Sequence, residues 1–162
     1  MTTTIEPPTE LLGAVVEQVW TSMLDRPPVD WSGPWPQHGT GTQADITIEG
    51  DWTGRLELWS SAEAATGLTQ VLLGLEPETE PEPADVADAL GEVVNVVAGG
   101  LKAAMGGTSV LGLPRVTGPA ATTPISDQAV HLALAWHDAP LLITVHPGHA
   151  GGSVPPHQEA PS

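Results

Sequence analysis

The residues with the clearest chemical potential are an asparagine and two acids spaced along one predicted helix. Asn95 is the only asparagine in the chain, and it follows Glu92 by three residues and Asp88 by seven. Inside a helix, asparagine is about 0.6–0.7 kcal/mol less favourable than alanine, so its presence here indicates a task for the carboxamide. An amide can both donate and accept hydrogen bonds.

A helix over about residues 84–105 must position these groups. At about 100° per residue, one face carries the chemically interesting residues: Asp88, Glu92, Asn95, Gly99 and Lys102. The opposite face is the predicted core stripe: Val86, Leu90, Val93, Val97, Leu101 and Ala104. The core stripe therefore turns the Asp88–Glu92–Asn95 motif towards solvent. Asp85 and Asp88 are predicted in the first turn, where the helix dipole favours negative charge, and Gly106 and Gly107 end the helix.

Gly91 and Gly99 flank the motif. Each lowers helix stability by about 1 kcal/mol relative to alanine, a cost that is understandable if another surface must approach closely. The plainer interpretation is that Glu and Asn three residues apart occur by chance on many solvated helices. Spacing alone does not decide between the two.

Composition bounds the remaining possibilities. A chain of 162 residues fits one domain, and without cysteine it has no disulfide framework and no thiolate metal site. Four basic against twenty acidic residues give a net charge of −16, which disfavours nucleic acid and anionic membranes as partners. We find no signal peptide and no apolar run of membrane-spanning length, and we therefore expect a cytoplasmic protein.

The first half of the chain predicts two helices around a hairpin. After a flexible terminus at 1–8, apolar periodicity indicates a helix over 9–25, followed by a Trp- and Pro-rich loop over 26–43. Alternation in 44–50 and 54–60 predicts a β-hairpin. Ser60 or Ser61 is expected to cap a helix that buries Ala65, Leu68 and Val71 and ends near Gly74. Alternating Pro and Glu over 76–83 indicate a solvated acidic linker.

The second half predicts strands after the long helix. Residues 110–116 are expected to form one strand, 117–126 a loop, and 128–136 and 141–146 an antiparallel pair. The tail at 148–162 is expected to be disordered. His146 and His149 could suggest a metal pair, but the intervening Pro and Gly prevent helical placement and no carboxylate follows at ligand spacing, so we predict no metal site.

The motif and the order of elements resemble the CheC/CheX/FliY family of chemotaxis phosphatases, most closely its CheX-like branch. The family signature has an acidic residue or Ser, then three positions, Glu, two positions and Asn, matched by Asp88, Glu92 and Asn95 in DALGEVVNVVAGGLK. The resemblance extends over about 9–146 and implies an α+β, two-layer fold with a mainly antiparallel sheet against long helices. The expected domain is 9–147. The first helix lacks a second Glu-x-x-Asn pattern, so one site is the limit.

The resemblance implies a phosphatase that acts on the aspartyl phosphate of a CheY-like receiver domain. Asn95 would orient the attacking water and Glu92 would pair with the receiver's lysine, while Asp88, Gly91, Gly99 and Lys102 would contact the partner. Mg²⁺ would belong to the receiver, and this chain would need no cofactor of its own. A homodimer formed through the sheets is also compatible with the resemblance. The alternative is a non-catalytic module of the same fold that recognises a receiver or signalling partner through the motif helix.

Overall fold

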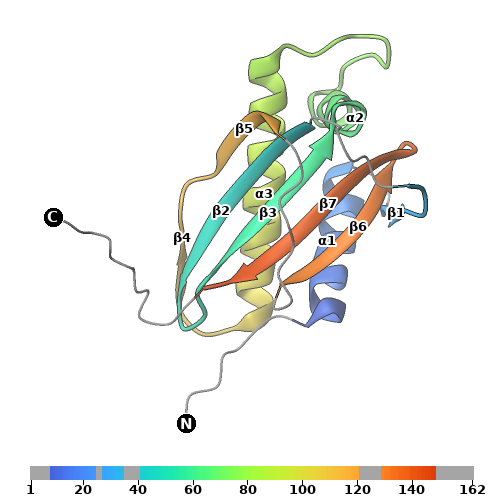
Figure 1. Cartoon of the computed structure of the whole chain (residues 1–162). Coiled ribbons are helices and arrows are strands. Elements are labelled where there is room, and N and C mark those ends of the chain that lie inside the picture. Colours follow the sequence, from blue (N-terminus) through green and yellow to red (C-terminus); the bar gives the residue numbers. More distant parts are fainter. Residues whose placement is uncertain (1–7, 25–26, 35–40, 121–128, 149–162) are drawn as a thin grey trace, which may run out of the picture.

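An antiparallel sheet covered on one face by helices positions the motif helix (Figure 1). The structure, a computed structural model, describes residues 8–24, 27–34, 41–120 and 129–148. The helices in these ranges are α1 (Thr9–Leu24), α2 (Ala62–Leu73) and α3 (Pro83–Met105). The strands in the same ranges are β1 (Val29–Asp30), β2 (Gly41–Gly50), β3 (Gly54–Ser61), β4 (Ser109–Leu111), β5 (Arg115–Ala120), β6 (Val130–Trp136) and β7 (Ala139–Pro147).

Within the described residues, the strands follow the order β1-β6-β7-β3-β2-β4, and β5 also pairs with β2. Every strand pair recorded there is antiparallel. The predicted hairpins are confirmed as β2–β3 and β6–β7. His137 and Asp138 connect β6 to β7 with φ of 51° and 67°, the left-handed conformation that a tight two-residue hairpin turn requires. The α+β, two-layer fold class is confirmed.

The core lies between the sheet and the helices. α3 packs on β2, β3 and β5, whereas α1 packs on β6, and Figure 1 shows both helices behind the strands. α1 buries the stripe that its periodicity predicts. The facing strand residues alternate as expected, with Ile46 and Ile48 on β2 and Leu56 and Leu58 on β3 all buried.

Both ends of α2 are fixed by local interactions. The Ser61 hydroxyl accepts a hydrogen bond from the Ala64 N–H at 3.2 Å, which confirms the predicted cap. Gly74 ends the helix with φ 67°, the left-handed conformation that favours glycine. The prediction that Val71 is buried is wrong, because 37% of this residue is exposed near the C-terminal end of α2.

Three sequence-based boundaries are wrong. The loop predicted over 26–43 contains β1 and ends where β2 begins at Gly41. The single strand predicted over 110–116 is two strands, β4 and β5, which pair with different ends of β2. Part of the loop predicted over 117–126 belongs to β5. Of the flexible terminus expected at 1–8 and the disordered tail expected at 148–162, residues 1–7 and 149–162 lie outside the described residues.

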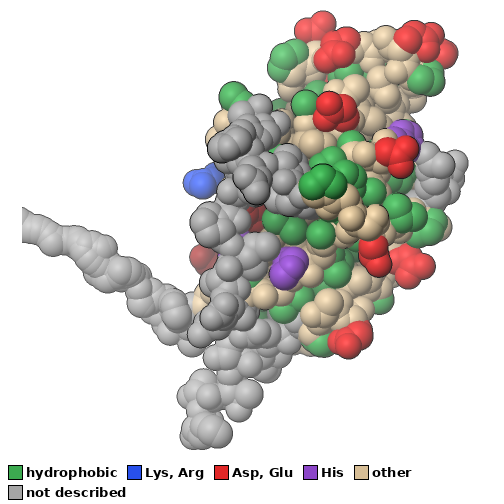
Figure 2. Space-filling view, turned by 45° about the vertical axis from the view of Figure 1, so that its right-hand side comes forward, with side chains coloured by type: hydrophobic (Ala, Val, Ile, Leu, Met, Phe, Trp, Pro, Cys, Tyr) green, Lys and Arg blue, Asp and Glu red, His purple; other side chains and the backbone are tan. Residues whose placement is uncertain are grey.

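The surface charge follows the composition. Acidic side chains are spread over the face shown in Figure 2, where basic side chains are scarce, in keeping with the net charge of −16. In the part of the chain that the structure describes, no helix has both the length and the apolar character needed to cross a membrane.

Candidate functional site

The candidate site lies on α3, whose buried side anchors it to the rest of the domain. Pro83 occupies the first helical position, where a missing N–H is tolerated, and Gly106 ends the helix with φ 74°. Four residues of the predicted stripe are buried, and Val86 is half-buried. The buried residues of α3 are Ala89, Leu90, Gly91, Val93, Val94, Val97, Ala98 and Leu101. Ala104 was predicted to be buried but is exposed, because it lies in the last turn of the helix.

The motif occupies the outward side of α3. Asp88 and Glu92 are exposed, while Asn95, Gly99 and Lys102 are half-buried. Helical geometry places Glu92 and Asn95 within roughly 60° of each other and about 4.5 Å apart along the axis. Asp88 is the sixth residue of α3, so only Asp85 lies in the first turn, and the prediction that Asp88 does so is wrong. Because the dipole effect fades after the first turn, it does not account for Asp88.

The polar side chains of this face have no partners within the described residues. No hydrogen bond or ion pair there involves the side chains of Asp88, Glu92, Asn95 or Lys102. Asp88 and Glu92 are four residues apart and repel each other weakly. As far as the described residues are concerned, the carboxylates and the amide are therefore available to an external group.

The glycines of α3 have different surroundings. A methyl group added at Gly91 would lie 3.7 Å from Pro114 Cβ and from Val116 Cγ2, so this buried glycine faces the connection between β4 and β5. The expectation that Gly91 contacts a partner does not fit this position, because its own domain covers it. Within the described residues, and apart from its chain neighbours and its own helix backbone, Gly99 has no heavy atom within 4 Å of such a methyl group on the motif face.

The adjacent glycine serves an internal contact that the sequence analysis missed. A methyl group at Gly100 would lie 2.9 Å from Val15 Cγ1 on α1. The surface that comes close to the helix at Gly100 is therefore α1 of the same chain. The sequence signal that could have predicted this contact was a Gly–Gly pair in one helix together with an apolar stripe on another.

Of the two histidines whose spacing could suggest a metal pair, His146 lies within the described residues. His146 Nε2 lies 2.7 Å from Glu57 Oε1, which also accepts a hydrogen bond from Arg55 Nη1 at 3.0 Å. These three residues form a polar network on the side of the sheet opposite the helices, since they alternate with the buried Leu56 and Val145. His149 lies outside the described residues. Across the ranges the structure describes, no three His, Asp or Glu side chains group as a metal site would require.

Sequence reasoning also missed a pocket beside the motif helix. Its walls come from α2, α3, β2, β5 and the loop before α3. Segments so far apart in the sequence give no local signal of a shared cavity. The only hint was the number of small residues in the first turns of α2 and α3.

Comparisons with known proteins support a single family and fold. The family model described as "Chemotaxis phosphatase CheX" matches residues 43–131, more than half of the chain, including all of α3. None of the curated proteins matches the chain. Chemotaxis protein CheX from Vibrio vulnificus is similar at 18% identity with a TM-score of 0.71, and the match covers 90% of this chain and 99% of that one.

Two further solved structures share the fold. CheX in the CheX–CheY–BeF3–Mg²⁺ complex from Borrelia burgdorferi is 16% identical with a TM-score of 0.70, over 87% of this chain and 98% of that one. FliY from Thermotoga maritima is 16% identical with a TM-score of 0.55, over 91% of this chain and 92% of that one. At these identities the likeness concerns the fold, and the family match concerns the sequence.

Proposed function

Because the chain belongs to the CheX family of chemotaxis phosphatases, we propose that it removes the phosphoryl group from the aspartyl phosphate of a CheY-like receiver domain. The observation that carries the proposal is the outward face of α3, where Glu92 and Asn95 stand on a buried helix and have no side-chain partners in the described residues. A related fold occurs in a complex with CheY, BeF3 and Mg²⁺. A reaction with such a receiver would take place in the cytoplasm.

Asn95 is the group we assign to the attacking water. Its carbonyl oxygen accepts a hydrogen bond from the water and its NH₂ donates one, so the amide fixes the water's position and orientation. The water oxygen forms a bond to phosphorus as the bond to the aspartyl oxygen breaks, which releases the receiver's carboxylate and inorganic phosphate. Phosphoryl transfer depends mainly on positioning and charge stabilisation, so an amide that positions the water is sufficient to accelerate the reaction.

Glu92 is assigned to docking. Its exposed carboxylate has no cation beside it in the described part of the chain, so it can pair with the receiver's lysine. Asp88, one turn earlier, extends the acidic edge, and Gly99 leaves room for the partner's surface. Lys102 lies two turns beyond Asn95 and would meet an acidic group of the receiver. In this proposal Mg²⁺ belongs to the receiver, and this chain contributes no metal ligand.

The test is Asn95→Ala, measured as loss of label from a phosphorylated receiver in the presence of Mg²⁺. The parent chain should accelerate the loss, and the variant should lower that acceleration by about 10²-fold, because the water is no longer oriented. The fold should be retained or slightly stabilised, since alanine is the better helix former by about 0.6–0.7 kcal/mol. Thermal unfolding of both proteins controls for misfolding.

Two results would count against the proposal in different ways. Equal decay of the label with and without the parent chain would exclude the phosphatase activity. Capture of a receiver without faster decay would favour the alternative, a non-catalytic module that binds through α3.

A further inference from the structure

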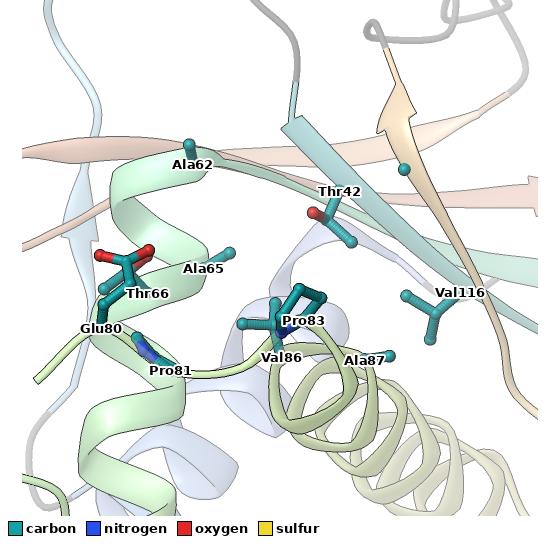
Figure 3. Close-up of a pocket in the computed structure, with 11 residues that line it drawn as sticks. Thr42, Ala62, Ala65, Thr66, Glu80, Pro81, Pro83, Val86, Ala87 and Val116 are labelled. Atoms are coloured by element: carbon teal, nitrogen blue, oxygen red, sulfur yellow. The ribbon is translucent and has the colours of Figure 1, made fainter.

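A pocket of about 410 Å³ lies where α2 and α3 begin (Figure 3). Ala62 and Ala65 come from the first turn of α2, Val86 and Ala87 from α3, and Val116 from β5. Figure 3 shows these side chains around the space between the two helices and the sheet edge. Most of the lining is apolar or small, and the volume lies within the range of roughly 300–1,000 Å³ that is typical of ligand pockets. We refer to it as the α2–α3 pocket.

The walls of the α2–α3 pocket are held in place by the domain itself. The loop before α3 is tied to α2 because Gln70 Nε2 donates to the carbonyl oxygens of Pro77 and Thr79, each at 2.8 Å. Pro81 of that loop is buried and lines the pocket. The cap at Ser61 fixes the start of α2. The pocket is therefore formed before any partner binds, which lowers the entropic cost of binding.

The α2–α3 pocket is continuous with the motif face. Ala87 lines the pocket and immediately precedes Asp88. Helical rise places Glu92 about 7.5 Å and Asn95 about 12 Å further along the axis than Ala87. Val116 lines the pocket and also packs against the position of Gly91. One globular partner can therefore contact the pocket and the motif together.

The charge around the pocket narrows the chemistry of its occupant. Glu80 lines the pocket, and Glu82 and Asp88 are exposed nearby on the same loop and helix. No lysine or arginine is among the described residues that line it. An apolar floor with an acidic rim is complementary to an apolar side chain that has a basic residue beside it.

We propose that the α2–α3 pocket is a second docking point for the receiver and determines which receiver is accepted. It takes an apolar side chain of the receiver that is flanked by lysine or arginine, while the motif enters the phosphorylated site. This inference rests on the proposed function, since the receiver is the occupant. The buried apolar side chain contributes affinity, and the acidic rim selects the partner.

The experiment fills the pocket with Ala87→Phe. A matched control, Ala104→Phe, adds the same side chain at an exposed position near the other end of α3. The dissociation constant is measured for a receiver loaded with beryllofluoride, and the turnover rate is measured at saturating phosphorylated receiver. We expect Ala87→Phe to raise the dissociation constant about 10-fold or more, the value of one buried aliphatic side chain, with little change in turnover. Ala104→Phe should match the parent in both measurements.

A second pair of variants covers the case in which Ala87→Phe fails to fold. Glu80→Lys reverses the charge at the rim, and Glu76→Lys makes the same change on the same loop away from the pocket. Glu80→Lys should weaken receiver binding several-fold more than Glu76→Lys at low salt, and the difference should shrink as salt screens the charges.

The outcomes separate this inference from the proposed function. If the parent neither binds nor dephosphorylates a receiver, both are overturned. If the parent is active but folded Ala87→Phe binds the receiver as the parent does, only the pocket inference is overturned. A change in oligomeric state with unchanged receiver binding would also overturn it, because the occupant would then be a second copy of this chain.

Discussion

Two adjacent glycines of α3 allow the packing around the motif to be tested with one substitution at two positions. In a helix, Gly→Ala is worth about 0.8–1.0 kcal/mol of stability. Gly99→Ala should realise the full gain, because its methyl group would meet no atom of another element within 4 Å in the part of the chain that the structure describes. In a chain of this size the midpoint of thermal unfolding should rise by roughly 2–4 °C. Gly100→Ala should lose the gain, because its methyl group would lie 2.9 Å from Val15 Cγ1 and overpacking costs about 1–3 kcal/mol.

The same two variants should also differ in their affinity for the receiver, and here Gly99→Ala should be the weaker of the two. Gly99 is on the outward face with Glu92 and Asn95, so a methyl group there would hold the receiver away and raise its dissociation constant several-fold. Gly100→Ala should bind nearly as the parent does. Urea unfolding gives the stabilities, and titration with a beryllofluoride-loaded receiver gives the affinities. The packing argument would be refuted if both variants were equally stable, and the docking argument if Gly99→Ala left the affinity unchanged.

Two further substitutions test single carboxylates. Glu92→Gln should raise the dissociation constant for the receiver about 10-fold with a smaller effect on turnover, because a neutral amide cannot form the ion pair; Glu17→Gln, an exposed acid on α1, is the control. A variant that bound normally but turned over slowly would contradict the docking role. Glu57→Gln should lower the free energy of unfolding by about 1–2 kcal/mol in urea titrations, because Arg55 and His146 lose their carboxylate; Arg55 is 36% exposed, which keeps the loss below that of a fully buried pair.

The parts of the fold that the sequence predicts are those with local causes. The stripe of α1, the cap at Ser61, the left-handed end at Gly74 and the two hairpins each depend on residues a few positions apart. The outward face of α3 was also predictable, because it is the complement of a strong apolar stripe. Periodicity indicates which way a residue faces around the helix axis, but not how far the neighbouring element extends along the helix. For this reason the burial of Ala104 and Val71 was mispredicted.

The remaining features depend on partners distant in the sequence. β4 and β5 are separate strands because each pairs with a different end of β2. The meaning of Gly91 and Gly100 depends on which element lies opposite, respectively the β4–β5 connection and α1. The α2–α3 pocket combines five segments of the chain. Periodicity and turn chemistry do not determine such contacts between distant segments of the chain.

The outward face of α3 contains several choices that weaken the helix locally. Asn95 replaces a better helix former, and Asp88 and Glu92 place like charges one turn apart. Gly99 costs about 1 kcal/mol although no described residue of another element lies opposite it. The buried stripe from Leu90 to Leu101 offsets this cost and anchors the helix to the core. In water these groups gain little from electrostatics, whereas inside a partner's site the lower effective dielectric makes the interactions of the same dipole and charge far stronger. A projecting, prepositioned motif is therefore expected to act only when docked, which links activity to recognition of the correct receiver.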